Sequence, residues 1–334
     1  MTAAPTTIRV LLQNYAGEGT AFHASEPMWK AACAKYPEIA KRIDARIGLG
    51  DADFKREIGD AHVFFSASSE VKARFPCEAP NLKAVFVTSA GLDRLAPYDW
   101  LPPGAQLLNN SGVHAHKAGD WCLMAMLMLV NNMPRFATAQ REKRWDKAFS
   151  GVAAGRTLVV VGVGDIGGTA ASRARQFGMK VVGVRARPAP HPACDEVVGA
   201  ERLDEVLPRA DLLLLATPLT PQTKGILSRQ RLALMKPTAG LVNIGRGALV
   251  DQDALCDALD ADKLAGAVLD VFTPEPLPAD SRVWTTRNLV VSPHVAADDP
   301  ATYTPLSLDL LLKNLEAWAA GKPMPNRVDT QRWY

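Results

Sequence analysis

The chain has 334 residues, and this length predicts two domains rather than one. A hydrophobic content of 48% and a charged content of 22% are typical of a water-soluble globular protein. The net charge of +3 is small and the basic residues are scattered, which argues against a nucleic-acid-binding surface.

The cysteines and the apolar segments further limit the class of protein. The five cysteines are odd in number and form no Cys-x-x-Cys pair, so we expect neither a disulfide framework nor a zinc site. His114 and His116 form a His-x-His pair without a further ligand at a recognisable spacing, and we predict no metal site. Residues 1–7 lack the features of a secretory signal, and the longest apolar run, 121–130, is about half a membrane span. We therefore expect a cytoplasmic protein with no membrane partner.

The first third of the chain predicts an α/β arrangement. Short apolar runs at Ile8–Leu12, Ala61–Phe65 and Leu82–Val87 indicate strands. The last of these leads into Thr88–Gly91, a turn expected to expose backbone N–H groups. The polar loop at 109–112 is expected to mark the first crossing into a second domain.

A nearly apolar helix is predicted from about Ala115 to Met133. A helix that is apolar on most of its faces should be buried, either between domains or between subunits.

From Thr157 onward, apolar strands alternate with helices. Continuous apolar runs are typical of parallel strands that are covered on both faces, and the alternation predicts a doubly wound sheet. The predicted strands are 157–161, 180–184, 211–216, 240–244, 265–269 and 289–291, and the predicted helices are 166–177, 203–207, 228–234, 252–259 and, at the end of the chain, 306–320.

A glycine-rich turn follows the first of these strands. Its residues Gly162-Val163-Gly164-Asp165-Ile166-Gly167 form Gly-x-Gly-x-x-Gly between a strand and a helix. Gly162 permits a tight turn, Gly164 lets the backbone approach a pyrophosphate, and Gly167 lets the helix pack close to the strand. The helix N-terminus then offers N–H groups to the phosphates. This turn, including Asp165 and Ile166, predicts a dinucleotide site.

The end of the next strand indicates which dinucleotide is bound. It carries Arg185 and Arg187, and no acidic residue follows before Asp195. An acidic side chain here would bind the ribose 2′-OH of NAD, whereas arginine can pair with a 2′-phosphate. We therefore predict a preference for NADP(H), with NAD(H) also possible. The alternative is that both arginines are solvated loop residues that confer little preference.

Three polar side chains follow later strands of the same sheet. Arg246, Glu275 and His294 each stand just beyond an apolar run. Ligands of open α/β sheets lie outside the carboxyl ends of the strands, so these side chains are predicted to converge on one cleft.

Together these motifs resemble the D-isomer-specific 2-hydroxyacid dehydrogenase family, and within it most closely the glyoxylate/hydroxypyruvate reductase branch. The resemblance covers nearly the whole chain. Its motifs are the glycine turn, residues 216–220 with Thr223, the segments around Arg246 and Glu275, Pro293-His294 and Ala90-Gly91-Leu92-Asp93.

The resemblance implies an architecture. A Rossmann cofactor domain at 108–298 would interrupt a flavodoxin-like substrate domain formed by 1–107 and 299–334. It also implies a homodimer formed through the cofactor domain, and the apolar helix at 115–133 suits that use.

The resemblance implies site roles as well. NADPH would supply a hydride, and His294 would supply the proton for the carbonyl oxygen. Glu275 would pair with His294, orient it and favour its protonated form. Arg246 would hold the substrate carboxylate and polarise the carbonyl group. The remaining implied contacts are the Ala90 and Gly91 N–H groups to the carboxylate, and Thr217, Pro218, Ile244 and Asp270 around the cofactor.

The expected activity is therefore NADPH-dependent reduction of a small 2-oxo acid, of the glyoxylate or hydroxypyruvate type, to the D-2-hydroxy acid. A phosphite dehydrogenase shares the same three side chains and stays an alternative, as does a non-enzymatic, cofactor-sensing corepressor of the same fold. A formate dehydrogenase is disfavoured because that branch has glutamine where Glu275 stands.

Overall fold

The computed structural model describes residues 4–15 and 22–331, and it divides the chain into two units. The first consists of Met1–His114 with Asp299–Tyr334, and the second is Ala115–Asp298. Each unit contains one sheet of parallel strands, with five strands in the first and seven in the second among the described residues. The predicted α/β class with parallel sheets is confirmed.

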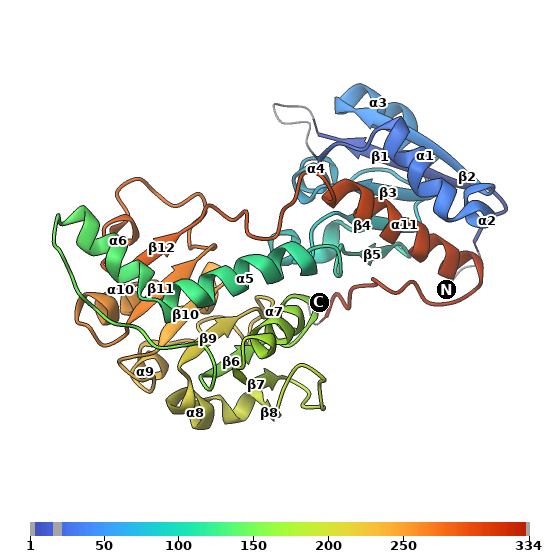
Figure 1. Ribbon diagram of the computed structural model, residues 1–334. Coiled ribbons are helices and arrows are strands. Elements are labelled where there is room, and N and C mark those ends of the chain that lie inside the picture. Colours follow the sequence, from blue (N-terminus) through green and yellow to red (C-terminus); the bar gives the residue numbers. More distant parts are fainter. Residues whose placement is uncertain (1–3, 16–21, 332–334) are drawn as a thin grey trace. The chain divides into compact units, whose positions relative to one another are not determined.

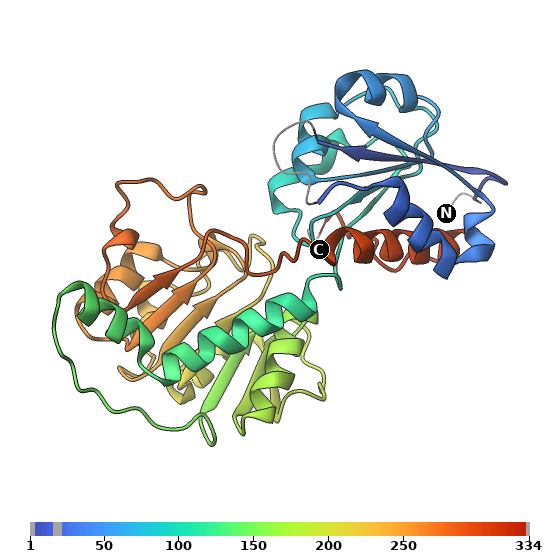
Figure 2. The same cartoon turned by 45° about the horizontal axis from the view of Figure 1, so that its top comes forward.

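The first unit has the strand order β2-β1-β3-β4-β5, which is the flavodoxin-like order. Helices cover both faces of this sheet (Figures 1 and 2). The strands are β1 (Ile8–Asn14), β2 (Ile43–Leu49), β3 (Val63–Ser66), β4 (Ala84–Val87) and β5 (Gln106–Leu108), and the helices are α1 (Glu26–Lys35), α2 (Pro37–Ala40), α3 (Gly50–Glu57), α4 (Ser68–Arg74) and α11 (Tyr303–Ala319).

Side chains that alternate in direction along the strands divide the core of this unit into two layers, one on each face of the sheet. Successive side chains of a strand point to opposite faces of the sheet. Val63 and Phe65 pack with leucines of α11, whereas Phe64 packs on the other side with Phe54 of α3. The last helix of the chain, α11, is therefore held in the first unit by a buried leucine stripe.

The second unit has the strand order β12-β11-β10-β9-β6-β7-β8. Its strands are β6 (Thr157–Val161), β7 (Lys180–Arg185), β8 (Glu196–Gly199), β9 (Leu212–Leu215), β10 (Gly240–Asn243), β11 (Gly266–Leu269) and β12 (Leu289–Val291), and its helices are α5 (Ala115–Val130), α6 (Met133–Arg141), α7 (Asp165–Gln176), α8 (Leu203–Val206), α9 (Arg229–Leu232) and α10 (Gln252–Asp260).

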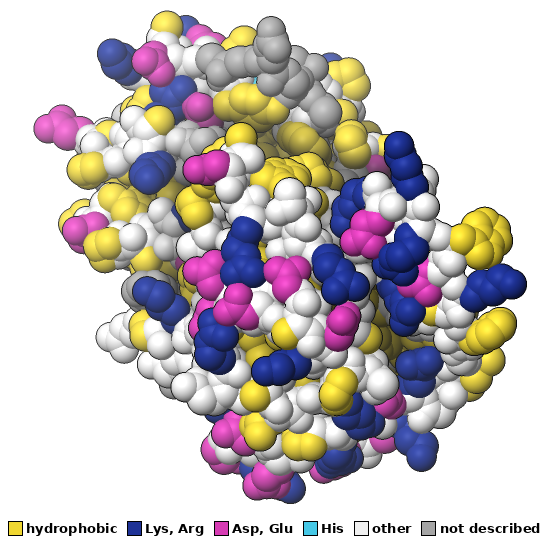
Figure 3. All heavy atoms as spheres, turned by 90° about the vertical axis from the view of Figure 1, so that its left-hand side faces the viewer, with side chains coloured by type: hydrophobic (Ala, Val, Ile, Leu, Met, Phe, Trp, Pro, Cys, Tyr) yellow, Lys and Arg dark blue, Asp and Glu magenta, His cyan; other side chains and the backbone are white. Residues whose placement is uncertain are grey.

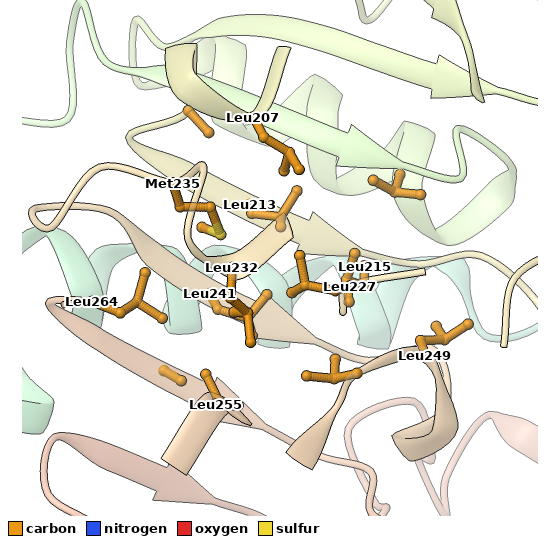
Figure 4. Packing of buried hydrophobic residues seen from close by; sticks show 14 of the residues in the cluster. Leu207, Leu213, Leu215, Leu227, Leu232, Met235, Leu241, Leu249, Leu255 and Leu264 are labelled. Atoms are coloured by element: carbon orange, nitrogen blue, oxygen red, sulfur yellow. The ribbon is translucent and has the colours of Figure 1, made fainter. Parts of the chain in front are cut away.

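Both faces of this sheet are covered, as its apolar strands predict. Leu212 and Leu214 face α5 and α7, whereas Leu213 and Leu215 face the layer of α8, α9 and α10. Figure 4 shows the second layer, where leucines from strands and helices interdigitate. The sheet is thus a rigid platform, and its strand ends are well placed to carry a site.

The predicted helix from Ala115 to Met133 is wrong in its extent. Helix α5 ends at Val130, Asn132 adopts the left-handed conformation with a φ of 55°, and α6 begins at Met133. A left-handed residue cannot continue a right-handed helix, and Pro134 suits the first turn of a new one. The side of α5 that faces the sheet is buried, but Met124 is 46% exposed, so this unit by itself does not bury the whole helix.

Three strands have no counterpart among the predicted elements. All three lie at sheet edges: β2 and β5 at the two ends of the five-stranded sheet and β8 at one end of the seven-stranded sheet. Residues of β2 are mostly half-buried, and its sequence Ile-Asp-Ala-Arg-Ile-Gly-Leu contains charged residues. An edge strand is partly solvated, so it lacks the continuous apolar run that identified the central strands.

The chain changes direction in the second sheet between β6 and β9. From β6 it passes outward to β7 and β8, and then returns to β9 on the other side of β6. Such a switch point leaves a crevice at the carboxyl ends of the two central strands, where doubly wound sheets bind their ligands. Among the described residues no helix is both long and apolar enough to cross a membrane.

Candidate active site

The glycine-rich turn lies at this switch point. Gly162 has a φ of 93°, and a Cβ atom there would come within 2.7 Å of the Thr217 backbone beyond β9. A Cβ atom on Gly167 would lie 2.0 Å from the carbonyl oxygen of Gly162. Above Gly164, in contrast, a Cβ atom would meet no described atom within 4 Å. Two glycines are therefore required by the close approach of backbones, and the third opens space beside the turn.

Helix α7 begins directly at this turn. Gly164 is its N-cap residue, and no described side chain caps the helix. Asp165 and Ile166 lie in the first turn, and the Ile166 N–H group can therefore donate to an anion at the positive end of the helix dipole. The glycines, the open space and the uncapped helix together fit the diphosphate of a dinucleotide.

The charged side chains at the carboxyl end of β7 are all basic. Arg185 is half-buried and Arg187 is exposed, and within the described part of the chain neither forms an ion pair. The nearest acid in the sequence, Asp195, accepts a hydrogen bond from the Val181 N–H at 2.8 Å and pairs with Arg175. Val181 is at the start of β7, so Asp195 lies at the wrong end of the strand to bind a ribose next to Arg185.

Three neighbouring strands position the three polar side chains that the sequence singled out. Arg246 follows β10, Glu275 follows β11, and His294 follows β12, and these strands are adjacent in the sheet. Since all three strands are parallel, their carboxyl ends lie along the same edge as the glycine turn.

Glu275 and His294 form a direct hydrogen-bonded pair. Oε2 of Glu275 lies 2.7 Å from Nδ1 of His294, and Oε1 accepts a hydrogen bond from the Phe272 N–H at 2.8 Å. The Glu275 side chain is 14% exposed and that of His294 39% exposed. Both carboxylate oxygens are therefore engaged, and the imidazole is held by Nδ1, while its Nε2 atom forms no hydrogen bond to another described residue.

A buried carboxylate organises the loop that carries His294. Asp270 is 1% exposed; its Oδ1 accepts hydrogen bonds from Ser292 Oγ at 2.6 Å and from Val295 N–H at 3.1 Å, and its Oδ2 accepts from Ala296 N–H at 3.0 Å. Burial raises the pKa of the Asp270 carboxyl, while these hydrogen bonds act in the opposite direction. Since the loop wraps around Asp270, His294 is held at a φ of 57°, which costs about 1–2 kcal/mol for an L-residue.

The turn that carries Arg246 rests on two contacts that the sequence did not reveal. Buried Asn243 donates from Nδ2 to the Arg246 carbonyl oxygen at 2.9 Å and accepts from the Gly245 N–H at 3.1 Å. A Cβ atom on Gly247 would lie 2.0 Å from the Phe272 carbonyl carbon. The Arg246 turn therefore packs directly against the segment whose N–H group holds Glu275. The only sequence signal for Asn243 is an amide in an apolar strand.

The other predicted cofactor residues lie along the same strand ends. Ile244 directly follows β10 and is buried, and Thr217 and Pro218 follow β9 beside Gly162. Thr223 Oγ1 donates to the Pro218 carbonyl oxygen at 2.7 Å, which closes this loop on itself. Asp270 is at the same edge, but the hydrogen bonds described above are all to its own loop.

Two sequence features belong to the first unit. Ala90 and Gly91 are half-buried and follow β4. His114 is buried, with its ring centroid 5.2 Å from that of Tyr303. In the described residues no group of three or more histidine, cysteine or acidic side chains could hold a metal ion.

Sequence comparison identifies the class of protein. Residues 123–296 match the NAD binding domain of the D-isomer specific 2-hydroxyacid dehydrogenases. The chain belongs to this family and is an NAD(P)-dependent oxidoreductase of 2-hydroxy acids. A glyoxylate reductase of Thermococcus litoralis is 33% identical over 263 residues, which is 75% of this chain and 78% of that protein. A D-3-phosphoglycerate dehydrogenase of Methanocaldococcus jannaschii is 32% identical over 279 residues, 82% of this chain but only 52% of the longer relative.

Solved structures agree with this assignment. An NADPH-dependent glyoxylate/hydroxypyruvate reductase of Sinorhizobium meliloti, in complex with NADP and sulfate, superposes with a TM-score of 0.79 at 25% identity, over 98% of this chain and 100% of that one. A D-isomer specific 2-hydroxyacid dehydrogenase of Xanthobacter autotrophicus, in complex with NADPH and MES, has a TM-score of 0.78 at 28% identity, over 99% of this chain and 100% of that one.

The contact between Gly167 and Gly162 makes a direct prediction about nucleotide binding. Gly167→Ala places a methyl group against the Gly162 carbonyl oxygen and must push α7 away from β6. We expect NADPH and NADH to bind at least about tenfold more weakly, since the phosphates lose aligned helix N–H groups. Fluorescence titration of the reduced nucleotides measures this. Gly59→Ala, at a position where a Cβ atom meets nothing within 4 Å, is the control, and equal affinities in both variants would contradict the assignment.

Proposed function

We propose that the protein reduces a small 2-oxo acid of the glyoxylate or hydroxypyruvate type to the D-2-hydroxy acid and prefers NADPH. The observation that carries this proposal is the Glu275–His294 pair at 2.7 Å, on the same sheet edge as the glycine turn and Arg246. The glyoxylate reductase among the relatives supports the choice of substrate.

Proton transfer falls to His294. The bound nicotinamide supplies the hydride for the C2 atom of the substrate. His294 donates from Nε2 to the carbonyl oxygen, because Nδ1 is committed to Glu275. Glu275 is a positioning residue that holds the ring in one orientation and one tautomer, and the Phe272 N–H holds Glu275 in turn.

Arg246 provides the positive charge that a 2-oxo acid requires. Its guanidinium group can form paired hydrogen bonds with the substrate carboxylate and can stabilise negative charge that develops on the carbonyl oxygen. Its Nη1 atom donates to the Gly245 carbonyl oxygen at 2.8 Å, which fixes one side of the guanidinium plane. In this proposal the N–H groups of Ala90 and Gly91 also bind the substrate carboxylate.

Arg185 and Arg187 support the preference for NADPH. They stand where a ribose phosphate lies at the end of the second strand of a dinucleotide site, and the described residues offer them no acidic partner. In this proposal the nicotinamide and the backbone of the cofactor lie near four further residues: Thr217, Pro218, Ile244 and Asp270.

Replacing His294 tests the reaction. With a panel of glyoxylate, hydroxypyruvate, pyruvate and phenylpyruvate we expect the wild type to reduce glyoxylate or hydroxypyruvate most efficiently. His294→Ala should lower kcat by about 10²- to 10⁴-fold for loss of the general acid, without weakening NADPH binding. Oxidation of NADPH followed by absorbance measures both. His191→Ala serves as the matched control, and turnover retained in His294→Ala would disprove the acid role.

A charge reversal tests the cofactor preference. Arg185→Asp removes a cation that would pair with the 2′-phosphate and introduces an acceptor for a ribose hydroxyl. We expect the ratio of kcat/KM with NADPH to that with NADH to fall by about 10- to 100-fold, the range for one charged hydrogen bond. Arg202→Asp, in the 3-10 turn after β8, is the control. An unchanged ratio in Arg185→Asp would show that this arginine does not select the cofactor.

We further propose that two copies associate through the second unit. Helix α5 exposes Met124, and the segment from Trp145 to Val152 exposes large apolar side chains: Trp145 at 89%, Phe149 at 95% and Val152 at 75%. Ion pairs from Arg135 and Arg144 to Asp146 anchor this segment beside α6. Figure 3 shows this end of the unit with basic and acidic side chains intermixed and several hydrophobic side chains at the surface. A second copy would cover such side chains.

The double variant Trp145→Ser with Phe149→Ser tests the association. Loss of two exposed aromatic anchors should shift the protein from dimer toward monomer at micromolar concentration, because such residues dominate interface energies. Sedimentation velocity measures the mass. Trp284→Ser, which removes another half-exposed tryptophan, should leave the dimer intact. A wild-type protein that sediments as a monomer would contradict the proposal.

A further inference from the structure

The turn after β4 has an unusual set of hydrogen bonds on its carbonyl side. Three consecutive carbonyl oxygens, those of Thr88, Ser89 and Ala90, each accept a hydrogen bond from outside the turn. Asn110 donates from its backbone N–H to Ser89 at 3.1 Å and from Nδ2 to Thr88 at 3.0 Å. Asn109 donates from Nδ2 to Ala90 at 3.0 Å.

A second donor reaches the Thr88 carbonyl oxygen from α11. Tyr303 Oη donates to it, and the Tyr303 ring makes an edge contact with Phe22 and a tilted contact with His114. Thr88 therefore uses both lone pairs of its oxygen, one for Asn110 and one for Tyr303. A carbonyl that is held by two donors cannot rotate without losing both hydrogen bonds.

These contacts form a closed ring across three segments. Asn110, with 0% of its surface exposed, also donates from Nδ2 to Ser307 Oγ at 2.9 Å. Ser307 Oγ in turn donates to the Tyr303 carbonyl oxygen at 2.8 Å. The ring thus runs from Thr88 to Asn110, Ser307, Tyr303 and back. A buried amide that satisfies two acceptors strongly specifies the position of both.

The ring determines which side of the turn is free. With the carbonyl groups directed at Asn109, Asn110 and Tyr303, the N–H groups of Ala90 and Gly91 donate to no other described residue. Two successive free N–H groups can together bind an anion, whereas a rotated peptide would present a carbonyl dipole that repels a carboxylate.

We propose that Tyr303, Asn110 and Asn109 are positioning residues that hold the Thr88–Gly91 turn in its carboxylate-binding orientation. They act through the backbone and need not touch the substrate. This inference rests on the proposed function, because it assigns the Ala90 and Gly91 N–H groups to the carboxylate of a 2-oxo acid.

Tyr303→Phe is the main test, because it removes one hydroxyl group and keeps the aromatic ring. We expect the KM for the 2-oxo acid to rise about threefold to tenfold, the range for one hydrogen bond, with kcat and the KM for NADPH changed less than about twofold. The inhibition constant of oxamate, a 2-oxo acid analogue, should rise by the same factor. Asn109→Ala, which frees the Ala90 carbonyl, should have the same effect independently.

Tyr98→Phe is the matched control. Tyr98 Oη donates at 3.3 Å to the carbonyl oxygen of Leu92, which lies just beyond the turn. Loss of this hydroxyl group should therefore change neither the KM for the 2-oxo acid nor the KM for NADPH. A merely structural role of Tyr303 would lower the melting temperature without the selective change in KM and oxamate binding, and would overturn the inference. Unchanged constants in both Tyr303→Phe and Asn109→Ala would overturn it as well. A wild type that reduces no 2-oxo acid would instead refute the proposed function, and this inference with it.

Discussion

The parallel direction of the strands is the constraint on which the site depends. Every strand of the seven-stranded sheet ends at the same edge, so residues far apart in sequence, such as Gly162 and His294, come to one edge without any direct signal between them. Leucine layers on both faces hold the sheet rigid, as parallel strands require. Chemistry at that edge then needs only short turns, each carrying one functional side chain.

Hydrogen bonds to the backbone then orient those turns. In the second unit the Asp270 carboxylate collects three hydrogen bonds from the loop of His294, and Asn243 does the equivalent for the turn of Arg246. In the first unit Asn110 and Tyr303 hold the carbonyl groups of the turn after β4. Buried polar groups are costly unless they are satisfied, and each of these is engaged with a loop whose direction matters for the proposed reaction.

Much of the fold was predictable from local pattern, and the failures have physical causes. The central strands are continuous apolar runs and were found, whereas β2 and β8 lie at sheet edges, where solvation removes the apolar signal. The end of α5 is not evident from the local pattern, because it depends on the left-handed backbone angle of Asn132. Asn243 went unnoticed because a single amide in a strand is common, and only its partners reveal its use.

The amino-acid sequence by itself determined the dinucleotide turn, the basic end of β7 and the identities of Arg246, Glu275 and His294, because these depend on residue type and spacing within a few positions. Tertiary structure alone decided that Glu275 holds His294 by Nδ1 and that Asp195 binds the backbone at the start of β7, away from Arg185. It also decided that Asn109, Asn110 and Tyr303 all donate hydrogen bonds to the short turn after β4. The reason is that each of these contacts joins residues from different segments, and their geometry exists only after the sheet and its covering helices have packed.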